Sequence, residues 1–546
     1  MAKKKAAAKR PKKTLPPASS KPLNSGENPD ESQAEYSGLP PPQLSFKSAI
    51  VAEMTSVISN GITINKVIQV LILAYIANLL YVKLDLNFDY DSKVEIGIGF
   101  LSILSSILII YVSRKRRWNT GVELGSIDKD DPEKWVELPE FNLIYAIVLP
   151  IFVTYIVDKR YLGVNLVNIL LVIDIPIAFK ILLALSMEQQ VLDESGYLNQ
   201  GFVTTRNNLL IPVAHVGFRE LLGYYGGSSF SNTESELFST LFVNLVLFVD
   251  KSNIELFILA KLTLAFIGSL VICTALYRVL ILFSPKYVIS LILHPVFTAL
   301  VYYGSVYQLA PVLGKHPWDY LVNDIMNEQR IHFLYSWLIL LVVVVPPVFY
   351  FVDAIPLDFR RKIWHFTILI ILSYPLSIDP SFCVIALGGV FGLFLVVEIL
   401  RSTEMPPFGQ ILSRNLEKFQ DERDKRGNIT ISYLYLVLGI VLPVMFDGSS
   451  CAGLVSLGLG DSMASMVGKR YGLVKWPGSN KSVEGTFAFI VVTFLGLLAA
   501  RTFFGYQFSW EISFIAAALA GVLEGISDFN DNIIIPLVVF TILHGQ

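Results

Sequence analysis

Long apolar runs with few charged residues recur along the chain from about residue 62 to residue 543. A helix that crosses the roughly 30 Å hydrocarbon core of a bilayer needs about 20 mostly apolar residues. Charged residues make up only 16% of the 546 residues, whereas soluble domains carry about 25%. The runs therefore predict an all-α, polytopic helical transmembrane protein and argue against a cytosolic enzyme.

Fourteen such runs can be distinguished, and several of them are short. Short runs suit re-entrant or half-length helices, so the count predicts a dozen or more membrane-spanning helices. The apolar segment 237–249 has no clear role, and no repeat of 20 to 50 residues is visible. The runs cover residues 62–82, 94–113, 141–157, 161–185, 255–283, 287–309, 331–352, 363–377, 381–400, 430–446, 449–467, 483–499, 511–526 and 533–543.

The N-terminal tail carries eight Lys and Arg residues and no acid in its first 21 positions, and small polar residues and prolines follow. Such a segment buries too little apolar surface to offset chain entropy, so residues 1–46 are predicted to be a disordered basic cytosolic tail. A second basic cluster, 114–117, follows the second run, which places the N-terminus in the cytosol. Residues 47–350 are then predicted to form an N-terminal transmembrane region of unassigned role, and residues 351–546 a C-terminal transmembrane region, which carries the candidate catalytic residues and nucleotide-binding loop described below.

Several classes of function are disfavoured by the sequence. The net charge of −2 gives no reason to expect a nucleic-acid partner. The cysteines Cys273, Cys383 and Cys451 lie in apolar runs, and no Cys/His pair has metal-ligand spacing, so neither redox chemistry nor structural zinc is expected. No soluble nucleotide-binding loop is present, because Gly468-Lys469 is followed by an arginine instead of a hydroxyl residue.

One small, polar helix face inside an apolar run stands out. If residues 458–468 are helical, Gly458, Asp461, Ser465 and Gly468 lie on one face, which continues into the basic pair Lys469-Arg470. A carboxylate inside a membrane helix usually needs a functional reason. An equally simple interpretation is a small-residue helix contact in which the carboxylate is a buried hydrogen-bond partner.

The loop that follows, 476–486, contains the residue types that a nucleoside triphosphate requires. Glycines allow close backbone approach, a lysine supplies charge for phosphate, and hydroxyls and a carboxylate suit a metal ion. The alternative is that the tryptophan is an interfacial aromatic residue and the lysine a membrane anchor. The residues in question are Trp476, Gly478, Lys481, Ser482, Glu484, Gly485 and Thr486.

Two further groups of polar residues are candidates for the site. Glu524, Asp528 and Asp531 would share one face of a continuous helix, and three acids beside an apolar run suit a divalent cation or a general base. A solvated polar turn is the alternative. Residues 361–365 hold Arg361, Lys362 and His365, which suit phosphate binding and proton transfer, or else simply anchor a span.

These motifs, in this order, resemble the dolichol kinase family of CTP-dependent polyprenol kinases. The resemblance covers about residues 351–546; the N-terminal runs resemble the family only in being apolar and numerous. It is shared in part by phytol kinase, CTP-dependent diacylglycerol kinase and phosphatidate cytidylyltransferase. The motifs are Arg361-Lys362-x-x-His365, Glu398-x-x-Arg401, Pro406-Pro407, Asp421-Glu422-Arg423-Asp424, Gly460-Asp461-x-x-Ala464-Ser465-x-x-Gly468-x-x-x-Gly472, Trp476-Pro477-Gly478, Lys481-Ser482-x-Glu484-Gly485-Thr486, Leu523-Glu524 and Asp531-Asn532.

The resemblance implies transfer of the γ-phosphate of CTP to the terminal hydroxyl of dolichol, giving dolichyl phosphate for protein glycosylation. It implies a divalent cation (Mg²⁺ or Ca²⁺), dolichol and the lipid bilayer as partners, and catalytic loops on the cytosolic face of the endoplasmic reticulum. It does not specify an oligomeric state. The alternatives are another CTP-using lipid enzyme of the kinds named above or, from a different class, a transporter with intramembrane ion ligands.

Each candidate residue then has an expected role. Metal ligands are expected at Asp461, Glu484 and Glu524. Orientation or deprotonation of the acceptor hydroxyl is expected from Asp531, Asp528 or His365, with Asp461 also counted as catalytic. Nucleotide contacts are expected from Arg361, Lys362, Gly458, Gly460, Ser465, Gly468, Lys469, Arg470, Trp476, Gly478, Lys481, Ser482, Glu484, Gly485 and Thr486.

Overall fold

The computed structural model divides the chain into two units, residues 1–53 and 54–546, and describes parts of the second. The described residues are 64–83, 214–226, short stretches between 229 and 243, 254–420, 424–477, 479–527 and 531–545. The predictions that lie outside them concern the tail 1–46, the runs 94–113, 141–157 and 161–185, and the residues Gly478, Asp421, Glu422, Arg423 and Asp528.

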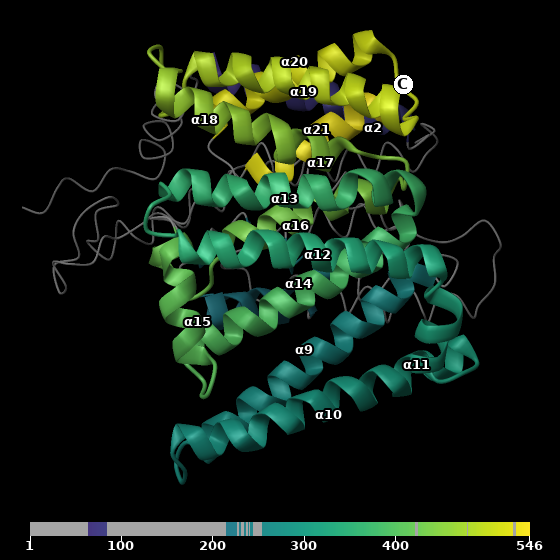
Figure 1. The fold of residues 1–546 in the computed structure, drawn as a ribbon, viewed down its shortest axis with the longest axis vertical. Coiled ribbons are helices and arrows are strands. Elements are labelled where there is room, and N and C mark those ends of the chain that lie inside the picture. The colour runs from purple at the N-terminus through teal and green to yellow at the C-terminus, as the bar shows by residue number, and fades with distance from the viewer. Residues whose placement is uncertain are drawn as a thin grey trace, which may run out of the picture. The chain divides into compact units, whose positions relative to one another are not determined.

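The described residues are helical except for connecting segments and one isolated antiparallel bridge between Lys475 and Ser482. The prediction of an all-α fold is therefore confirmed for this part of the chain, because uninterrupted apolar runs satisfy their backbone groups within one segment as helices. Figure 1 shows the arrangement of the helices, with colour running from purple to yellow along the chain. The longer ones are α2 (Ile64–Lys83), α9 (Ile254–Leu280), α10 (Lys286–Leu313), α12 (Glu328–Tyr350), α13 (Leu357–Ile378), α14 (Pro380–Thr403), α16 (Ser432–Phe446), α19 (Val483–Phe504), α20 (Trp510–Ile526) and α21 (Asp531–His544).

Five of the described helices, α9, α10, α12, α14 and α19, are long and apolar enough to cross a membrane. Their outward faces are apolar as well: on α12, Leu338, Ile339 and Val342 are each more than half exposed. Exposed leucine and valine in this density suit contact with lipid and not with water. The chain is therefore a membrane protein, and the larger total of a dozen or more spans stays a prediction.

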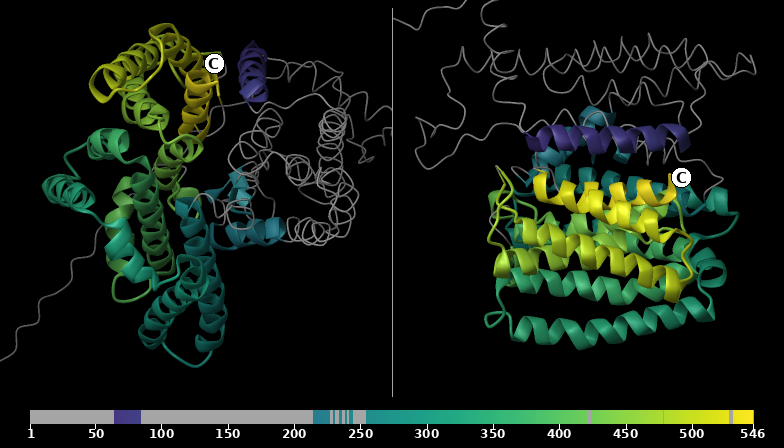
Figure 2. Two further views of the ribbon diagram at one scale, coloured as in Figure 1. Left: turned by 90° about the vertical axis from the view of Figure 1, so that its right-hand side faces the viewer. Right: turned by 90° about the horizontal axis from the view of Figure 1, so that it is seen from above.

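The C-terminal helices pack into the part of the molecule that carries most of the sequence motifs. Helix α19 packs against α20 and against α18 (Ser462–Tyr471), while α21 packs against α16 and α20 (Figure 1). Helix α2 packs against α20 and α21, and both views of Figure 2 show it in purple beside the yellow C-terminal helices. One hydrophobic core joins these elements, with Tyr435, Phe489 and Phe540 as its largest buried side chains.

The predicted run 449–467 is not one regular α-helix. It consists of α17 (Ala452–Val455), the π-helical segment η7 (Ser456–Asp461) and the start of α18. A π-helical turn closes i→i+5 hydrogen bonds, so the spacing that aligns four residues on an α-helical face does not hold across it. The expected shared face is therefore wrong for Gly458, while Ser465 and Gly468 lie in the regular helix that follows.

Candidate active site

Asp461 ends the π-helical segment η7 and is buried. The ammonium of Lys362, from α13, donates a hydrogen bond to its Oδ2 at 2.6 Å. His365 Nδ1, one helical turn further along α13, lies 3.5 Å from the same oxygen and 3.1 Å from the carbonyl oxygen of Leu457. Lys362 and His365, both predicted to act on substrates, thus lie against Asp461 and fix its orientation.

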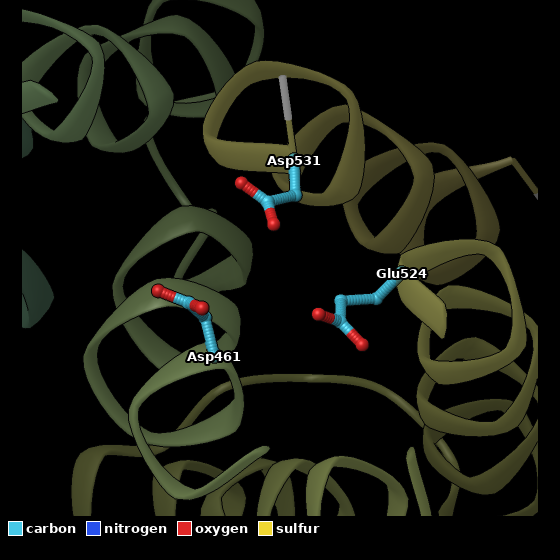
Figure 3. A group of neighbouring side chains, drawn as sticks. All are labelled: Asp461, Glu524 and Asp531. Carbon is cyan, nitrogen blue, oxygen red and sulfur yellow. The ribbon is translucent and has the colours of Figure 1, made fainter. Parts of the chain in front are cut away.

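Three carboxylates converge from three elements, as Figure 3 shows. Asp461, Glu524 and Asp531 each offer one carboxylate oxygen, and these three oxygens lie within 4.8 Å of one another. We call the three residues the carboxylate cluster. Glu524 lies in the last turn of α20 and Asp531 is the first residue of α21. The continuous helix considered for Glu524 to Asp531 does not form, because α20 ends at Ile526 and α21 begins at Asp531; the two carboxylates therefore come together from separate helices.

Lys481 reaches the carboxylate cluster from the loop between α18 and α19. Its Nζ lies 2.8 Å from Glu524 Oε1, from Asp531 Oδ2 and from the backbone oxygen of Glu524. Burial lowers the pKa of Lys481, but the carboxylates of Asp531 and Glu524 outweigh this effect and raise its pKa above the ordinary value. The side chain is therefore a cation at neutral pH, held in a fixed place beside two carboxylates.

The loop that carries Lys481 is ordered by its own polar residues. Glu484 accepts hydrogen bonds from the backbone N–H groups of Leu473 and Val474, both at 3.1 Å, so this predicted metal ligand closes the loop and is not part of the carboxylate cluster. Ser482 caps α19 by accepting from Gly485 N–H. The indole of Trp476 donates to Thr486 Oγ1 at 2.9 Å, which ties the loop to the first turn of α19.

The glycines of the motif allow close helix packing. A Cβ at Gly460 would lie 2.2 Å from Thr493 Oγ1, and one at Gly485 would lie 2.9 Å from the backbone oxygen of Ala464. Gly468 faces Ser482 and Gly485 in the same way, and Gly458 faces Leu369. Since η7, α18 and α19 approach this closely only without side chains at these positions, Gly460, Gly468 and Gly485 hold Asp461 and the Lys481 loop near each other, while Gly458 allows η7 to pack against α13.

The remaining predicted nucleotide-binding residues lie around the end of α18 and the start of α13. Lys469 forms an ion pair with Asp358, and both side chains are at least half exposed. Arg470 is exposed beside it, and Ser465 is half-buried in the middle of α18. Arg361 donates to Ser432 Oγ at 3.2 Å. None of these residues belongs to the carboxylate cluster.

A second buried polar group, the Glu398 network, consists of Glu398, Arg401, Thr430 and Tyr433. Arg401 donates to both oxygens of Glu398 at 2.8–3.0 Å, Thr430 N–H donates at 2.8 Å, and the Tyr433 hydroxyl donates as well. Arg401 also donates to the backbone oxygen of Asn428 at 2.6 Å. Five hydrogen bonds, three of them from the two-pronged ion pair with Arg401, satisfy this fully buried carboxylate.

Sequence reasoning missed two amide residues of α2, Asn65 and Gln69. Gln69 donates to the backbone oxygen of Ile526 at 2.6 Å, and Asn65 donates to that of Pro477 at 2.5 Å. The sequence feature that could have identified them is a pair of amide residues four positions apart inside the apolar run 62–82.

The carboxylate cluster has the chemistry of a divalent-cation site. Carboxylate oxygens are the ligands that Mg²⁺ and Ca²⁺ prefer. Lys362 and Lys481 supply two positive charges against three carboxylates, so the cluster itself retains an excess of negative charge. Its donor set and spacing therefore fit a bound cation.

Comparison with known proteins extends the resemblance to most of the chain. The chain is 32% identical over 414 residues to a dolichol kinase of Saccharomyces cerevisiae, covering 73% of this chain and 76% of that protein. It is 33% identical over 266 residues to dolichol kinase sec59 of Schizosaccharomyces pombe, which covers 44% and 52% of the two chains. Dolichol kinase EVAN of Arabidopsis thaliana is 31% identical over 42% of this chain and 43% of its own length.

The N-terminal half carries a family signature of its own. Residues 27–250 match the family model described as the dolichol kinase N-terminal domain. The expectation that this region resembles the family only in being apolar was therefore too narrow. No solved structure matches the chain.

Proposed function

The chain belongs to the dolichol kinase family, and on this premise we propose that it transfers the γ-phosphate of CTP to the terminal hydroxyl of dolichol. The hydroxyl oxygen forms a bond to the γ-phosphorus, the bond from that phosphorus to the β-phosphate oxygen breaks, and CDP leaves. The hydroxyl proton passes to a carboxylate and then to solvent. The observation that carries the proposal is the convergence of Asp461, Glu524 and Asp531 beside Lys481.

Phosphoryl transfer depends mostly on positioning and on neutralising charge. A Mg²⁺ or Ca²⁺ ion held by Asp461, Glu524 and Asp531 would neutralise negative charge on the phosphate oxygens of the nucleotide. The three carboxylates are pre-positioned for this purpose, because Lys362 and His365 restrain one of them and Lys481 the other two.

Lys481 is the group best placed to contact the transferring phosphate. About a third of its side chain is exposed, although its ammonium is held by two carboxylates. Exposed basic residues at the end of α18, Lys469 and Arg470, add positive charge that attracts the triphosphate toward this point. The segment 472–482 connects these charges to the first turn of α19, and we expect it to border the nucleotide.

Asp531 is the best candidate to orient the acceptor hydroxyl. Its side chain is 28% exposed, whereas those of Asp461 and Glu524 are 12% and 8% exposed, so it is the member of the carboxylate cluster most accessible to a second substrate. A primary alcohol is a weak nucleophile, and a positioned carboxylate assists its attack. His365 serves instead to position Asp461, because its Nδ1 already faces Asp461 and Leu457.

The two substrates require a site at the membrane surface. CTP is water-soluble and highly anionic, whereas dolichol is a long lipid with one terminal hydroxyl. A cytosolic loop that carries Lys481, set against apolar helices that carry Glu524 and Asp531, would bring the two together. We place this site on the cytosolic face of the endoplasmic reticulum, where dolichyl phosphate would feed protein glycosylation.

The test uses purified full-length protein in detergent with dolichol and CTP labelled in the γ-phosphate. A kinase moves the label to the lipid, whereas a cytidylyltransferase releases it in pyrophosphate, and a transporter consumes no nucleotide. Asp461→Asn should lower the rate of label transfer by about a thousandfold while the protein remains folded. The control is Asp324→Asn, which removes an exposed carboxylate paired with Lys315. Near-normal transfer by Asp461→Asn would refute the proposed site.

A further inference from the structure

Helix α2 carries two amide side chains on one face of an otherwise apolar segment. Asn65 and Gln69 are four residues apart, which places them one above the other on the helix surface. Gln69 is only 2% exposed. A buried carboxamide costs free energy unless it is hydrogen-bonded, so its partner indicates what the helix is built to contact.

The partner of Gln69 is the end of α20. Gln69 Nε2 donates to the backbone oxygen of Ile526 at 2.6 Å, and Ile526 is the last residue of that helix. The last carbonyl groups of a helix have no partner within it. Here Gln69 binds one of them, and Lys481 binds the backbone oxygen of Glu524, so side chains from two distant parts of the chain fix the turn that presents Glu524.

The partner of Asn65 is the loop that carries Lys481. Asn65 Nδ2 donates to the backbone oxygen of Pro477 at 2.5 Å. The adjacent Trp476 ring packs against the α20 end, since a Cβ at Gly525 would lie 2.4 Å from its Nε1 atom. One face of α2 therefore contacts both segments between which Lys481 and Glu524 meet.

Packing supports these two hydrogen bonds. Ile72, Leu73 and Ile76, further along α2, are buried in the same hydrophobic core as residues of α20 and α21. The contact is therefore a continuous helix interface and not an isolated pair of hydrogen bonds. It also falls within residues 27–250, which match the N-terminal family model.

We propose that α2 is a positioning element of the phosphoryl-transfer site, with Asn65 and Gln69 as positioning residues that hold the Lys481 loop against the end of α20. This inference rests on the proposed function, and it gives the N-terminal region a specific role in catalysis. The hydrogen bonds of these two residues go to backbone oxygens and not to the carboxylate cluster. Asn65 acts on the cluster through the backbone of Pro477, and Gln69 through that of Ile526.

The test replaces Gln69 by methionine, which has nearly the same length and shape but cannot donate a hydrogen bond. Gln69→Met should lower kcat per folded molecule by about tenfold, because small displacements of catalytic groups are costly. It should also raise the Mg²⁺ concentration for half-maximal rate several-fold, while KM for dolichol stays unchanged. The matched control is Val70→Met, at an exposed position on the same helix.

The outcomes separate the two proposals. A purely structural role for Gln69 would reduce the yield or thermal stability of the protein without changing kcat or the Mg²⁺ requirement of the folded fraction. If Asp461→Asn is inactive but Gln69→Met has the same kcat and the same Mg²⁺ requirement as Val70→Met, the inference about α2 is wrong. If Asp461→Asn keeps its activity, the proposed site itself is wrong, whatever Gln69→Met does.

Discussion

The carboxylate cluster and the Glu398 network are both buried polar groups in an apolar helical protein, but they are built differently. In the Glu398 network, Arg401 neutralises the carboxylate, which also accepts from Thr430 and Tyr433. In the carboxylate cluster, three carboxylates lie beside two lysine ammonium groups, so the attraction for a further cation remains. Buried charge that is internally balanced stabilises one arrangement of helices, whereas unbalanced buried charge is suited to binding a ligand.

The largest expected effect tests whether the Glu398 network stabilises the fold. Glu398→Gln leaves the guanidinium of Arg401 buried without a counter-ion, which should cost about 3–5 kcal/mol of stability. Thermal unfolding in detergent measures the loss, and Glu417→Gln, an exposed change nearby, is the control. Combining Glu398→Gln with Arg401→Met should recover part of the loss. Unchanged stability together with lost turnover would mean that the network belongs to the active site.

The next largest effect tests whether the carboxylate cluster binds a divalent cation. Glu524→Gln removes one carboxylate but leaves Lys481 paired with Asp531, so folding should be preserved. The rate should fall by about a hundredfold, and the Mg²⁺ concentration for half-maximal rate should rise at least as strongly as in Gln69→Met. A Mg²⁺ titration of initial rates measures both changes. Glu511→Gln, in the exposed first turn of the same helix, should behave as wild type; an unchanged Mg²⁺ requirement for Glu524→Gln would remove it from the cation site.

The smallest effect concerns the exposed charges around the carboxylate cluster. Lys469→Ala breaks a half-exposed pair with Asp358, so stability should change by less than about 1 kcal/mol. KM for CTP should rise about threefold at low salt, and the difference should shrink as ionic strength screens the charge. Initial rates at two salt concentrations check this. A large fall in kcat would show instead that Lys469 contacts the transferring phosphate.

The sequence by itself determined the helices and the residue types of the site. Apolar runs predicted both ends of α14, α16, α20 and α21 within three residues, and those of α13 and α19 within six. This succeeded because helix hydrogen bonds and apolar periodicity are local, so a short window of sequence contains them. The motif order also singled out Asp461, Lys481, Glu524 and Asp531 before any geometry was known.

Only the tertiary structure decided how those residues are combined. Lys362 meets Asp461 across 99 positions of sequence, and Gln69 meets Ile526 across 457. It also decided that Glu484 orders a loop, while Asp531, at the start of a helix separate from α20, joins the carboxylate cluster. Such contacts depend on how whole helices pack, and a helix face has many partners of similar chemistry, so spacing along one segment does not specify them.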